Sequence, residues 1–488
     1  MSDTFDVAVI GAGIDGLTAA AYLAKAGKRV VVLEAQAKVC GLCGSTELRD
    51  GFLVPRVAQT LYALDPQVLK DFPSVQRGLA FAARDLAQVG LGEDGRVVTL
   101  SRDTNETVRS IALHARADAQ AWPSFRAGLF RLARAMRSSW WTGEAFDPDA
   151  LSSSNRATFA ELQTMSAAAW LDSRFESGLL KATLAFDAAA GSLLEPGSAL
   201  PLLWRAAQEI DGVQGAVALP RGSAGALAPL LSSTAIQAGA TVQTGARVAR
   251  LLVDTGSVTG VELESGETLL CGAVLSSLSR RNTLLGLAPD AAPLALLRAL
   301  QRIPVRTGTA LVTLALSDAP NLARGEAPLA SRYIVADRLE TIIAADLAAR
   351  AGRLPDEIPF EIVVPSQLDG SVAPPGSHVL TCLVRPVPVA PPEGWNVLKP
   401  KLTAKIIGTL DRLSPGLVPD IMAVDVITPE DIADEDGVQT PERMIGPWRA
   451  RIDTPIAGLY LCGAGVEPVA AVSGRAGRIA AALVAGKP

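Results

Sequence analysis

Three glycines and one carboxylate near the start of the chain have the spacing of a dinucleotide site. Gly11, Gly13 and Gly16 follow an apolar run that ends at Ile10, and Glu34 closes a second apolar run, eighteen residues beyond Gly16. In such sites the first glycine permits a tight turn, the second lets the backbone approach a pyrophosphate, and the third lets helix and strand pack closely. The helix would turn its positive end toward the phosphates, and Glu34 would accept hydrogen bonds from the adenosine ribose. The alternative is a tight turn that holds no ligand.

A second glycine turn lies near the C-terminus. An apolar run ends at Gly463-Ala-Gly465, and Pro468 precedes a helix that we expect to begin near Ser473. This turn offers close backbone approach and another positive helix end, which suits the electron-rich side of a reduced flavin. No second Gly-x-Gly-x-x-Gly follows a strand-like run, so the sequence offers no separate nicotinamide domain. The sequence therefore predicts a single dinucleotide cofactor.

Cys40 and Cys43 have the spacing of a redox dithiol and lie in a glycine turn shortly after Glu34. We favour a structural pair of small residues beside the cofactor. Thiol redox or a regulatory disulfide, covalent flavin attachment and metal binding are the alternatives. A zinc site is disfavoured because the pair has no further Cys or His nearby, and we expect no metal site.

Other reactive side chains are few, and none is assigned a catalytic role. Of the two histidines, His378 is expected to start a strand. Glu467 fits either a general base or a solvated acid. Tryptophans recur in a predicted helical segment, among them Trp140, Trp141, Trp170 and Trp204. We expect them in the helix core or an interface, with the lining of a substrate tunnel as the alternative.

Composition limits the class of protein. With 488 residues the chain exceeds what one hydrophobic core usually serves, so we expect at least two domains. Hydrophobic residues make up 49% and charged residues 19%, which is apolar, yet no run of eighteen apolar residues predicts a membrane span. A large core, a homo-oligomer interface, or an apolar substrate tunnel with peripheral membrane contact would explain the excess. The net charge of −5 argues against nucleic acid as a partner.

The first strand-like run begins five residues from Met1, which leaves no room for a signal peptide and predicts a cytoplasmic protein, with membrane association as a further possibility. Five cysteines, an odd number, do not form a disulfide framework.

The apolar patterns predict an α/β protein with a Rossmann-type domain and a second, substrate-binding domain. Helical spacing from about 115 to 207 predicts a helical insert. Short runs separated by glycines over 239–266 predict strands of a meander, and the run 273–277 is expected to rejoin the first sheet. The proline-rich stretch 291–424 predicts a mixed sheet of the second domain.

Several stretches together resemble the phytoene-desaturase-like flavoproteins of the amine oxidase superfamily, with most likeness to the branch that contains pyridine nucleotide-disulphide oxidoreductase domain-containing protein 2. The stretches are Gly11 to Glu34, Asp50-Gly-Phe through Leu64-Asp-Pro66, Met165 to Leu171 with Phe175-Glu-Ser, Pro196 to Ala199, Pro220-Arg-Gly, Gly239 to Gly266, Pro374 to His378, and Thr454-Pro to Gly477.

The resemblance implies FAD held by a discontinuous domain, residues 1–70, 215–290 and 425–488, beside a substrate domain of residues 71–214 and 291–424. The cofactor-binding residues that it implies, including those of the glycine motif, are Gly11, Gly13, Ile14, Asp15, Gly16, Glu34, Ala35, Cys40, Gly41, Val248, Gly463, Gly465, Val472 and Ser473.

The chain departs from the family pattern in two places. Cys40-Gly41 stands where the family has two glycines, and Glu467-Pro-Val469-Ala-Ala471 stands where it has His-Pro-Gly-Gly-Gly. Side chains there replace bare backbone near the expected flavin, so flavin affinity, flavin geometry or the reaction can differ.

The leading hypothesis is an FAD-dependent oxidoreductase that desaturates or otherwise oxidises a largely apolar, isoprenoid- or carotenoid-like substrate. Hydride would pass to flavin N5, and oxygen or a quinone would take the electrons. Such chemistry needs position and water exclusion more than an acid or base. We therefore expect the helical insert and residues 291–424 to enclose an apolar pocket with few charges that ends at the flavin ring. An amine or amino-acid oxidase and a non-catalytic flavoprotein or assembly factor are the alternatives.

Overall fold

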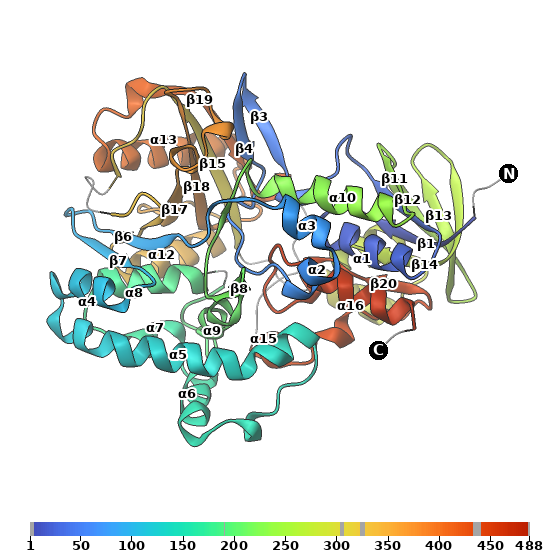
Figure 1. The fold of residues 1–488 in the computed structure, drawn as a ribbon, viewed down its shortest axis with the longest axis horizontal. Helices are drawn as coiled ribbons and strands as arrows, with labels where there is room; N and C mark the ends of the chain where they lie inside the picture. The colour runs from blue at the N-terminus through green and yellow to red at the C-terminus, as the bar shows by residue number, and fades with distance from the viewer. Residues whose placement is uncertain (1–3, 190, 303–306, 323–326, 433–440, 487–488) are drawn as a thin grey trace.

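The computed structural model describes residues 4–189, 191–302, 307–322, 327–432 and 441–486. Two sheets dominate this part of the chain and lie at opposite sides of the molecule, with a group of helices below the second sheet (Figure 1). The α/β class, the Rossmann-type sheet made of separated segments and the second mixed sheet are confirmed.

The first sheet has the strand order β11-β2-β1-β14-β13-β12, and β20 also pairs with β14. Its strands are β1 (Thr4–Ile10), β2 (Val30–Glu34), β11 (Thr241–Thr244), β12 (Val248–Asp254), β13 (Ser257–Leu263), β14 (Thr268–Ser276) and β20 (Leu459–Leu461). The pairs of β1 with β2, β1 with β14, β2 with β11 and β14 with β20 are parallel, whereas β12, β13 and β14 pair antiparallel.

Helices cover this sheet because its strands are apolar on both sides. Val7 and Val9 of β1 belong to the core beneath α1 (Ile14–Lys25), α10 (Leu227–Gln237) and α16 (Arg475–Val484), while Ala8 and Ile10 face the opposite core. The opposite core includes residues of the β12–β13 hairpin and of α11 (Leu294–Arg302). Alternate residues of a strand point to opposite faces, so β1 is buried on both.

The meander predicted for residues 239–266 is wrong in its first strand. Thr241–Thr244 pairs in parallel with β2 at the edge of the sheet, and only β12 and β13 continue antiparallel into β14. The connection between β2 and β11 is long enough for a parallel crossover. The glycines that flank residues 241–244 indicate turns but do not show that the strand pairs with the distant β2. The expected return of residues 273–277 to the first sheet is confirmed by β14.

The second sheet has the order β19-β15-β18-β17-β16-β6-β7. Its strands are β6 (Ala87–Leu91), β7 (Val97–Leu100), β15 (Gly308–Leu316), β16 (Ser331–Val335), β17 (Phe360–Val363), β18 (His378–Val387) and β19 (Ile421–Ile427). Only β16 and β6 pair in parallel within the described sheet. The apolar face of α13 (Trp395–Leu413) packs on one side, and α12 (Leu339–Arg350) lies against the helical insert.

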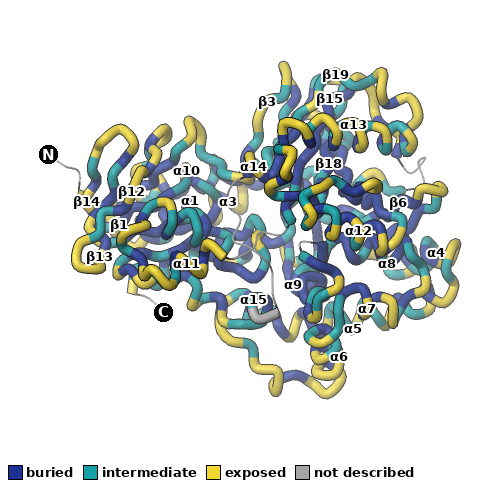
Figure 2. Tube along the Cα trace, turned by 180° about the vertical axis from the view of Figure 1, so that it is seen from behind, coloured by how far each residue is buried: buried dark blue, intermediate teal, exposed yellow. Residues whose placement is uncertain are grey.

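The helical insert consists of α5 (Arg116–Thr142), α6 (Ser153–Thr164), α7 (Ala167–Asp172), α8 (Gly178–Ala185) and α9 (Leu200–Ala207), preceded by α4 (Thr104–Ala112). Trp140, Trp170 and Trp204 are buried in its core, as predicted, and Trp141 is half-buried beside them. The helix α9 lies near the middle of the molecule in both views (Figures 1 and 2). Every residue of α9 except Arg205 is buried.

Short elements connect these parts. They are β3 (Ser45–Arg49), β4 (Phe52–Pro55), α2 (Pro66–Asp71), α3 (Pro73–Gly78), β5 (Phe81–Ala83), β8 (Glu209–Ile210), β9 (Val213–Gln214), β10 (Leu219–Pro220), α14 (Pro429–Ile432) and α15 (Pro441–Ile445). The predicted division of the chain into domains stays a prediction, and β19 crosses its boundary at residue 425 because it pairs with β15. Among the described residues, no helix has both the length and the apolar character needed to cross a membrane.

Candidate functional site

The first glycine motif forms the turn between β1 and α1, and its three glycines have different surroundings. Gly11 has a φ of +90°, and a Cβ there would lie 2.3 Å from Ser277 Oγ. A Cβ on Gly16 would lie 2.1 Å from the carbonyl oxygen of Gly11, so α1 packs on the turn only because residue 16 is glycine. A Cβ on Gly13 would meet nothing within 4 Å. The backbone is therefore open at Gly13, where the sequence predicts the pyrophosphate.

Glu34 lies at the end of β2 with its carboxylate turned toward this turn. Its Oε2 accepts a hydrogen bond from the backbone N–H of Ala12 at 2.7 Å, and its Oε1 accepts one from Gln36 N–H at 2.8 Å. Each carboxylate oxygen keeps a further lone pair, so the group can also hold ribose hydroxyls. The half-buried Ala35 follows, and the backbone N–H of Ala246 donates to the carbonyl of Glu34 at 2.8 Å.

Val248 begins β12 two residues after that contact. It is buried in the core that includes Val31 and Leu33 of β2. The structure thus brings Val248 to the same end of the sheet as Glu34.

A second glycine turn packs directly against the first. Gly41 has a φ of +57°, and a Cβ there would lie 3.2 Å from Gly13 Cα. The buried Cys43 thiol donates to the carbonyl oxygen of Ala224 at 3.1 Å. Burial raises the pKa of Cys43 to about 12 and also raises the pKa of Cys40. Because the thiolate is the reactive form, these surroundings favour a structural pair over a redox dithiol.

The C-terminal turn lies beside the first glycine motif. It follows β20, and a Cβ on Gly463 would lie 2.1 Å from the carbonyl oxygen of Ser277. A Cβ on Gly477 in α16 would lie 2.0 Å from the carbonyl oxygen of Asp15 in α1. The two helices therefore touch near their N-termini, which brings two positive helix ends together.

The other predicted residues of this region occupy supporting positions. Ile14 is buried in the core beneath α1, and Val472 is a half-buried residue that packs against it. The carbonyl oxygen of Gly465 accepts a hydrogen bond from Arg443. The carbonyl oxygen of Ser473 accepts from Asp65 N–H at 2.9 Å, which ties the start of α16 to the segment before α2.

Asp15 has a buried side chain between α1 and α16. Its carboxyl lies near the backbone N–H groups of Gly474 and Gly477, and its Oδ1 has no hydrogen-bond partner. Burial raises the pKa of Asp15 well above its ordinary value, and the nearby Glu467 raises it further. A protonated Asp15 would add no negative charge beside a pyrophosphate. The open backbone at Gly13, the lone pairs of Glu34 and the paired helix ends all fit a dinucleotide.

Glu467 is a buried member of an ion-pair network, so of the two alternatives the solvated acid is wrong and the general base stays a prediction. Its Oε2 lies 2.8 Å from Arg475 Nη1, both side chains are fully buried, and Ser473 Oγ donates to the same carboxylate. Arg475 Nη2 also donates to Gln208 Oε1 at 3.2 Å, and Asp65 pairs with Arg478 at 2.8 Å. Burial raises the pKa of Glu467, and Arg475 opposes this rise. The network fastens α16 to α9 and to the segment before α2.

A second buried network runs through the second sheet. Arg332 on β16 forms two hydrogen bonds to Asp187 at 2.8 and 2.6 Å and one to Glu361 on β17 at 2.6 Å. Gln59 Nε2 donates to Glu361 Oε1 at 2.9 Å, and Thr381 Oγ1 donates to Gln59 Oε1 at 2.6 Å. The network thus connects the sheet with the segment that follows the β3–β4 hairpin.

The charge of Asp187 is fixed by its partner. Burial alone would raise the pKa of Asp187, but the Arg332 guanidinium outweighs it and lowers the pKa to about 2. Asp187 is therefore a carboxylate at neutral pH and a poor proton acceptor.

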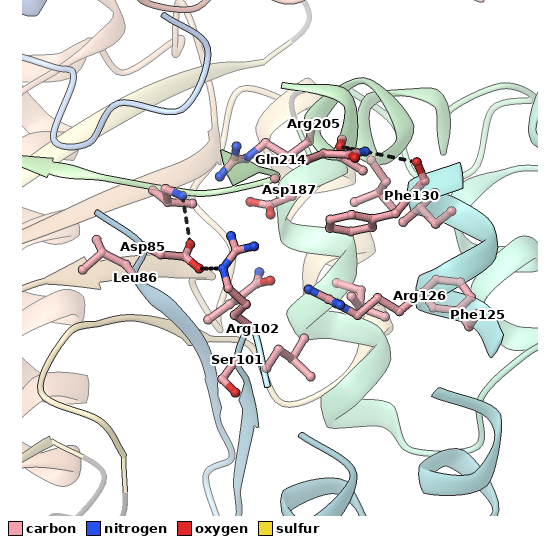
Figure 3. Close-up of a pocket in the computed structure, with 18 of the residues that line it drawn as sticks. Asp85, Leu86, Ser101, Arg102, Phe125, Arg126, Phe130, Asp187, Arg205 and Gln214 are labelled. Atoms are coloured by element: carbon pink, nitrogen blue, oxygen red, sulfur yellow. Dashed lines mark hydrogen bonds and ion pairs between the residues drawn. The ribbon is translucent and has the colours of Figure 1, made fainter. Parts of the chain in front are cut away.

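A cavity of about 140 Å³ opens beside this network. Figure 3 shows Arg126 extending from α5 toward Arg102, with Arg205 near Asp187. The apolar part of the lining includes Trp122, Phe125, Leu129, Phe130, Leu184 and Leu202. The charged part consists of Asp85, Arg102, Arg126, Asp187, Arg205 and Arg332.

The six charged residues of this lining differ from the apolar pocket with few charges that the sequence predicts. Sequence reasoning missed these charged residues because they lie far apart in the chain and form no motif. A signal was present in β16 and β17, where Arg332 and Glu361 each interrupt a short apolar run, since an isolated charge inside a buried strand needs a partner. His378 begins β18, as expected, with Nδ1 3.1 Å from Ser366 Oγ.

Comparisons with known proteins agree with the fold and the glycine motif. Residues 9–72 match the family described as NAD(P)-binding Rossmann-like domain. An oxidoreductase from Methanosarcina mazei superimposes with a TM-score of 0.67 over 99% of this chain and 100% of its own, at 17% identity. A putrescine oxidase bound to putrescine superimposes with a TM-score of 0.63 over 99% and 98%, at 15% identity. These matches define the fold, a Rossmann-like dinucleotide-binding domain within an amine-oxidase-like architecture.

Two relatives show which family the chain belongs to. The chain is 30% identical to mouse pyridine nucleotide-disulfide oxidoreductase domain-containing protein 2 over 98% of its own length and 93% of that protein. It is 27% identical to phytoene dehydrogenase of Streptomyces griseus over 95% and 91%. The chain belongs to the family of the mouse protein, and its resemblance to the phytoene-desaturase-like branch is confirmed.

Proposed function

We propose that this protein is an FAD-dependent oxidoreductase that dehydrogenates or desaturates a largely apolar substrate. The observation that carries the proposal is the meeting of two glycine turns and two helix N-termini at Gly13, with Glu34 at the edge. Bound FAD would supply the acceptor for a hydride from the substrate. The phytoene dehydrogenase relative supports a substrate of isoprenoid or carotenoid character.

The residues of the chain would act by binding and by excluding water. The glycine turns and Glu34 would hold the pyrophosphate and adenosine ribose. The aromatic and aliphatic lining of the cavity would keep the substrate in a dry site, where orientation contributes much of the rate. Asp187 is held ionised by Arg332 and accepts no proton at neutral pH, so no proton transfer by Asp187 enters the proposal.

Electron transfer from the reduced enzyme to oxygen or a quinone completes the proposed cycle. A cytoplasmic location, peripheral membrane contact and a homo-oligomer stay predictions from the sequence. A flavin amine or amino-acid oxidase is the second candidate, because the putrescine oxidase shares the fold. A non-catalytic flavoprotein is the third, and only reduction of bound flavin by a substrate separates it from the enzymes.

Glu34→Ala tests the cofactor assignment. A hydrogen bond to a charged group contributes about 1.5–3 kcal/mol, so loss of the carboxylate should weaken FAD binding by roughly tenfold to a hundredfold. FAD fluorescence titration of the purified protein measures the affinity, and the visible spectrum during anaerobic addition of candidate substrates reports reduction. Glu264→Ala is the control, because Glu264 is exposed and its 3.6 Å contact with Arg247 is a surface pair. A wild-type protein that takes up no FAD contradicts the proposal.

A further inference from the structure

The cavity beside Asp187 carries more positive than negative charge. Four guanidinium groups and two carboxylates belong to its lining. They come from elements far apart in the sequence, namely the loop before β6, the loop after β7, α5, the segment after α8, α9 and β16. Figure 3 shows Asp85, Arg102, Arg126, Asp187 and Arg205 around one space.

Both carboxylates of the lining already have partners. Asp85 Oδ2 accepts from Arg102 Nε at 2.8 Å, and Asp85 Oδ1 accepts from Val217 N–H at 3.3 Å. Asp187 is paired with both terminal nitrogens of Arg332. An ammonium ligand would have to compete with these guanidinium groups, so the cavity disfavours a cation.

Arg205 and Arg126 are the guanidinium groups of the lining for which no carboxylate of the described chain lies within ion-pair distance. Arg205 is the one residue of α9 that is not buried, and its Nη1 is shielded from solvent with no hydrogen-bond partner. Its guanidinium lies 4.0 Å from the ring centroid of Tyr62, and that of Arg126 lies 4.7 Å from the ring centroid of Phe130. Aromatic faces hold both groups in position but supply no anion.

A desolvated guanidinium without an anion is costly, whereas a carboxylate matches its planar donors. Burial lowers the pKa of Arg205 to about 10 although Asp187, which lies nearby but beyond ion-pair distance, opposes this shift, so the group is still charged at neutral pH. The lining also includes Trp122, Phe125 and Leu129, which lie on α5 together with Arg126. The volume of about 140 Å³ is close to that of an engineered cavity that binds benzene, so an apolar group of that size fits.

We propose that this cavity binds a largely apolar molecule through a single carboxylate, which Arg205 and Arg126 recognise while the aromatic wall holds the apolar part. This proposal rests on the proposed function in one respect: the ligand is the substrate only if the protein is the proposed oxidoreductase. Binding itself requires no redox chemistry.

Calorimetric titration of the purified full-length protein, with and without added FAD, tests the proposal with octanoate, 1-octanol and octylammonium as probes. Octanoate should bind about tenfold or more tightly than 1-octanol, since a charged hydrogen bond separates the two. Arg205→Met should weaken octanoate binding by about tenfold or more and leave 1-octanol unchanged. Arg205→Lys, which keeps the charge but lacks the planar pair of donors, should lose less affinity than Arg205→Met.

Arg131→Met is the matched control, because Arg131 is exposed on the helix that carries Arg126 and does not line the cavity. Equal binding of octanoate and 1-octanol, no binding of octanoate, or a preference for octylammonium would each overturn the proposal. Octanoate binding by a protein that takes up no FAD would keep this site and refute only the proposed oxidoreductase. FAD uptake without octanoate binding would refute this site and keep the proposed oxidoreductase.

Discussion

The two regions of this molecule that we propose to bind ligands are built in different ways. Around Gly13 the surface is made of backbone, which is open because glycines at 11, 16 and 41 let two turns and a helix meet closely. Around Arg205 the surface is made of long side chains from five or more separated elements. A site made of backbone needs glycines at a fixed spacing, which can be recognised in the sequence. A site made of side chains from separate elements shows only isolated charged residues in the sequence. The sequence therefore predicted the glycine turn around Gly13, whereas for the second region it predicted a pocket but not the charged lining around Arg205.

Both regions also depend on a buried arginine that lies within 4.0 Å of two carboxylates, Arg475 with Glu467 and Asp65 in the first and Arg332 with Asp187 and Glu361 in the second. Removing the shared cation should therefore cost more than removing one of the two anions. Replacement of Arg475 by Met should lower the free energy of unfolding by about 3–5 kcal/mol, because it leaves Glu467 buried without its cation. Urea unfolding followed by circular dichroism measures the loss. Arg250→Met, which breaks an exposed pair with Glu262, is the control and should cost less than about 1 kcal/mol. Equal losses in the two variants would contradict the assignment.

Asp187→Asn should have a smaller effect, about 1.5–3 kcal/mol, because Glu361 still neutralises Arg332. The pH dependence follows from the lowered pKa of Asp187. The pair stabilises the fold above the usual aspartate pKa of 3.8, and this contribution is lost as pH falls toward about 2. Unfolding measured from pH 7 to pH 3 should show a constant difference between wild type and variant above about pH 5, which narrows below it. A difference that grows on acidification would contradict the pairing.

The smallest effect is expected at the cysteine pair. The double variant Cys40→Ser with Cys43→Ser should keep FAD and most of the turnover, with a stability change of about 1 kcal/mol for the buried Cys43. Flavin absorbance and steady-state rates check this. Retained flavin with lost turnover would show that the thiols take part in the chemistry.

Much of the fold followed from local patterns in the sequence. The glycine spacing and two apolar runs predicted β1, α1 and β2, and helical spacing predicted the insert from 115 to 207. The position of β11 was missed, since a parallel partner can be far away in the chain and leaves no turn signal.

The side-chain environment of Glu467 could not be read from its neighbours. The sequence places Glu467 in an apparent loop before α16. Arg475 comes eight residues later, and its Nη1 lies 2.8 Å from Glu467 Oε2. The same holds for Arg205, whose exposure toward a cavity depends on how α5 and β7 pack against α9. Such contacts depend on tertiary packing, which a local pattern does not specify.

The most direct test of the backbone site is the FAD affinity of Gly13→Ala. The added methyl group would meet no protein atom within 4 Å, so the variant should unfold at nearly the wild-type urea concentration. The methyl group would instead occupy the space predicted for the pyrophosphate, and FAD titration should show a loss of affinity of about tenfold or more, equivalent to about 1.4 kcal/mol. A folded Gly13→Ala protein that binds FAD as tightly as wild type would contradict the account.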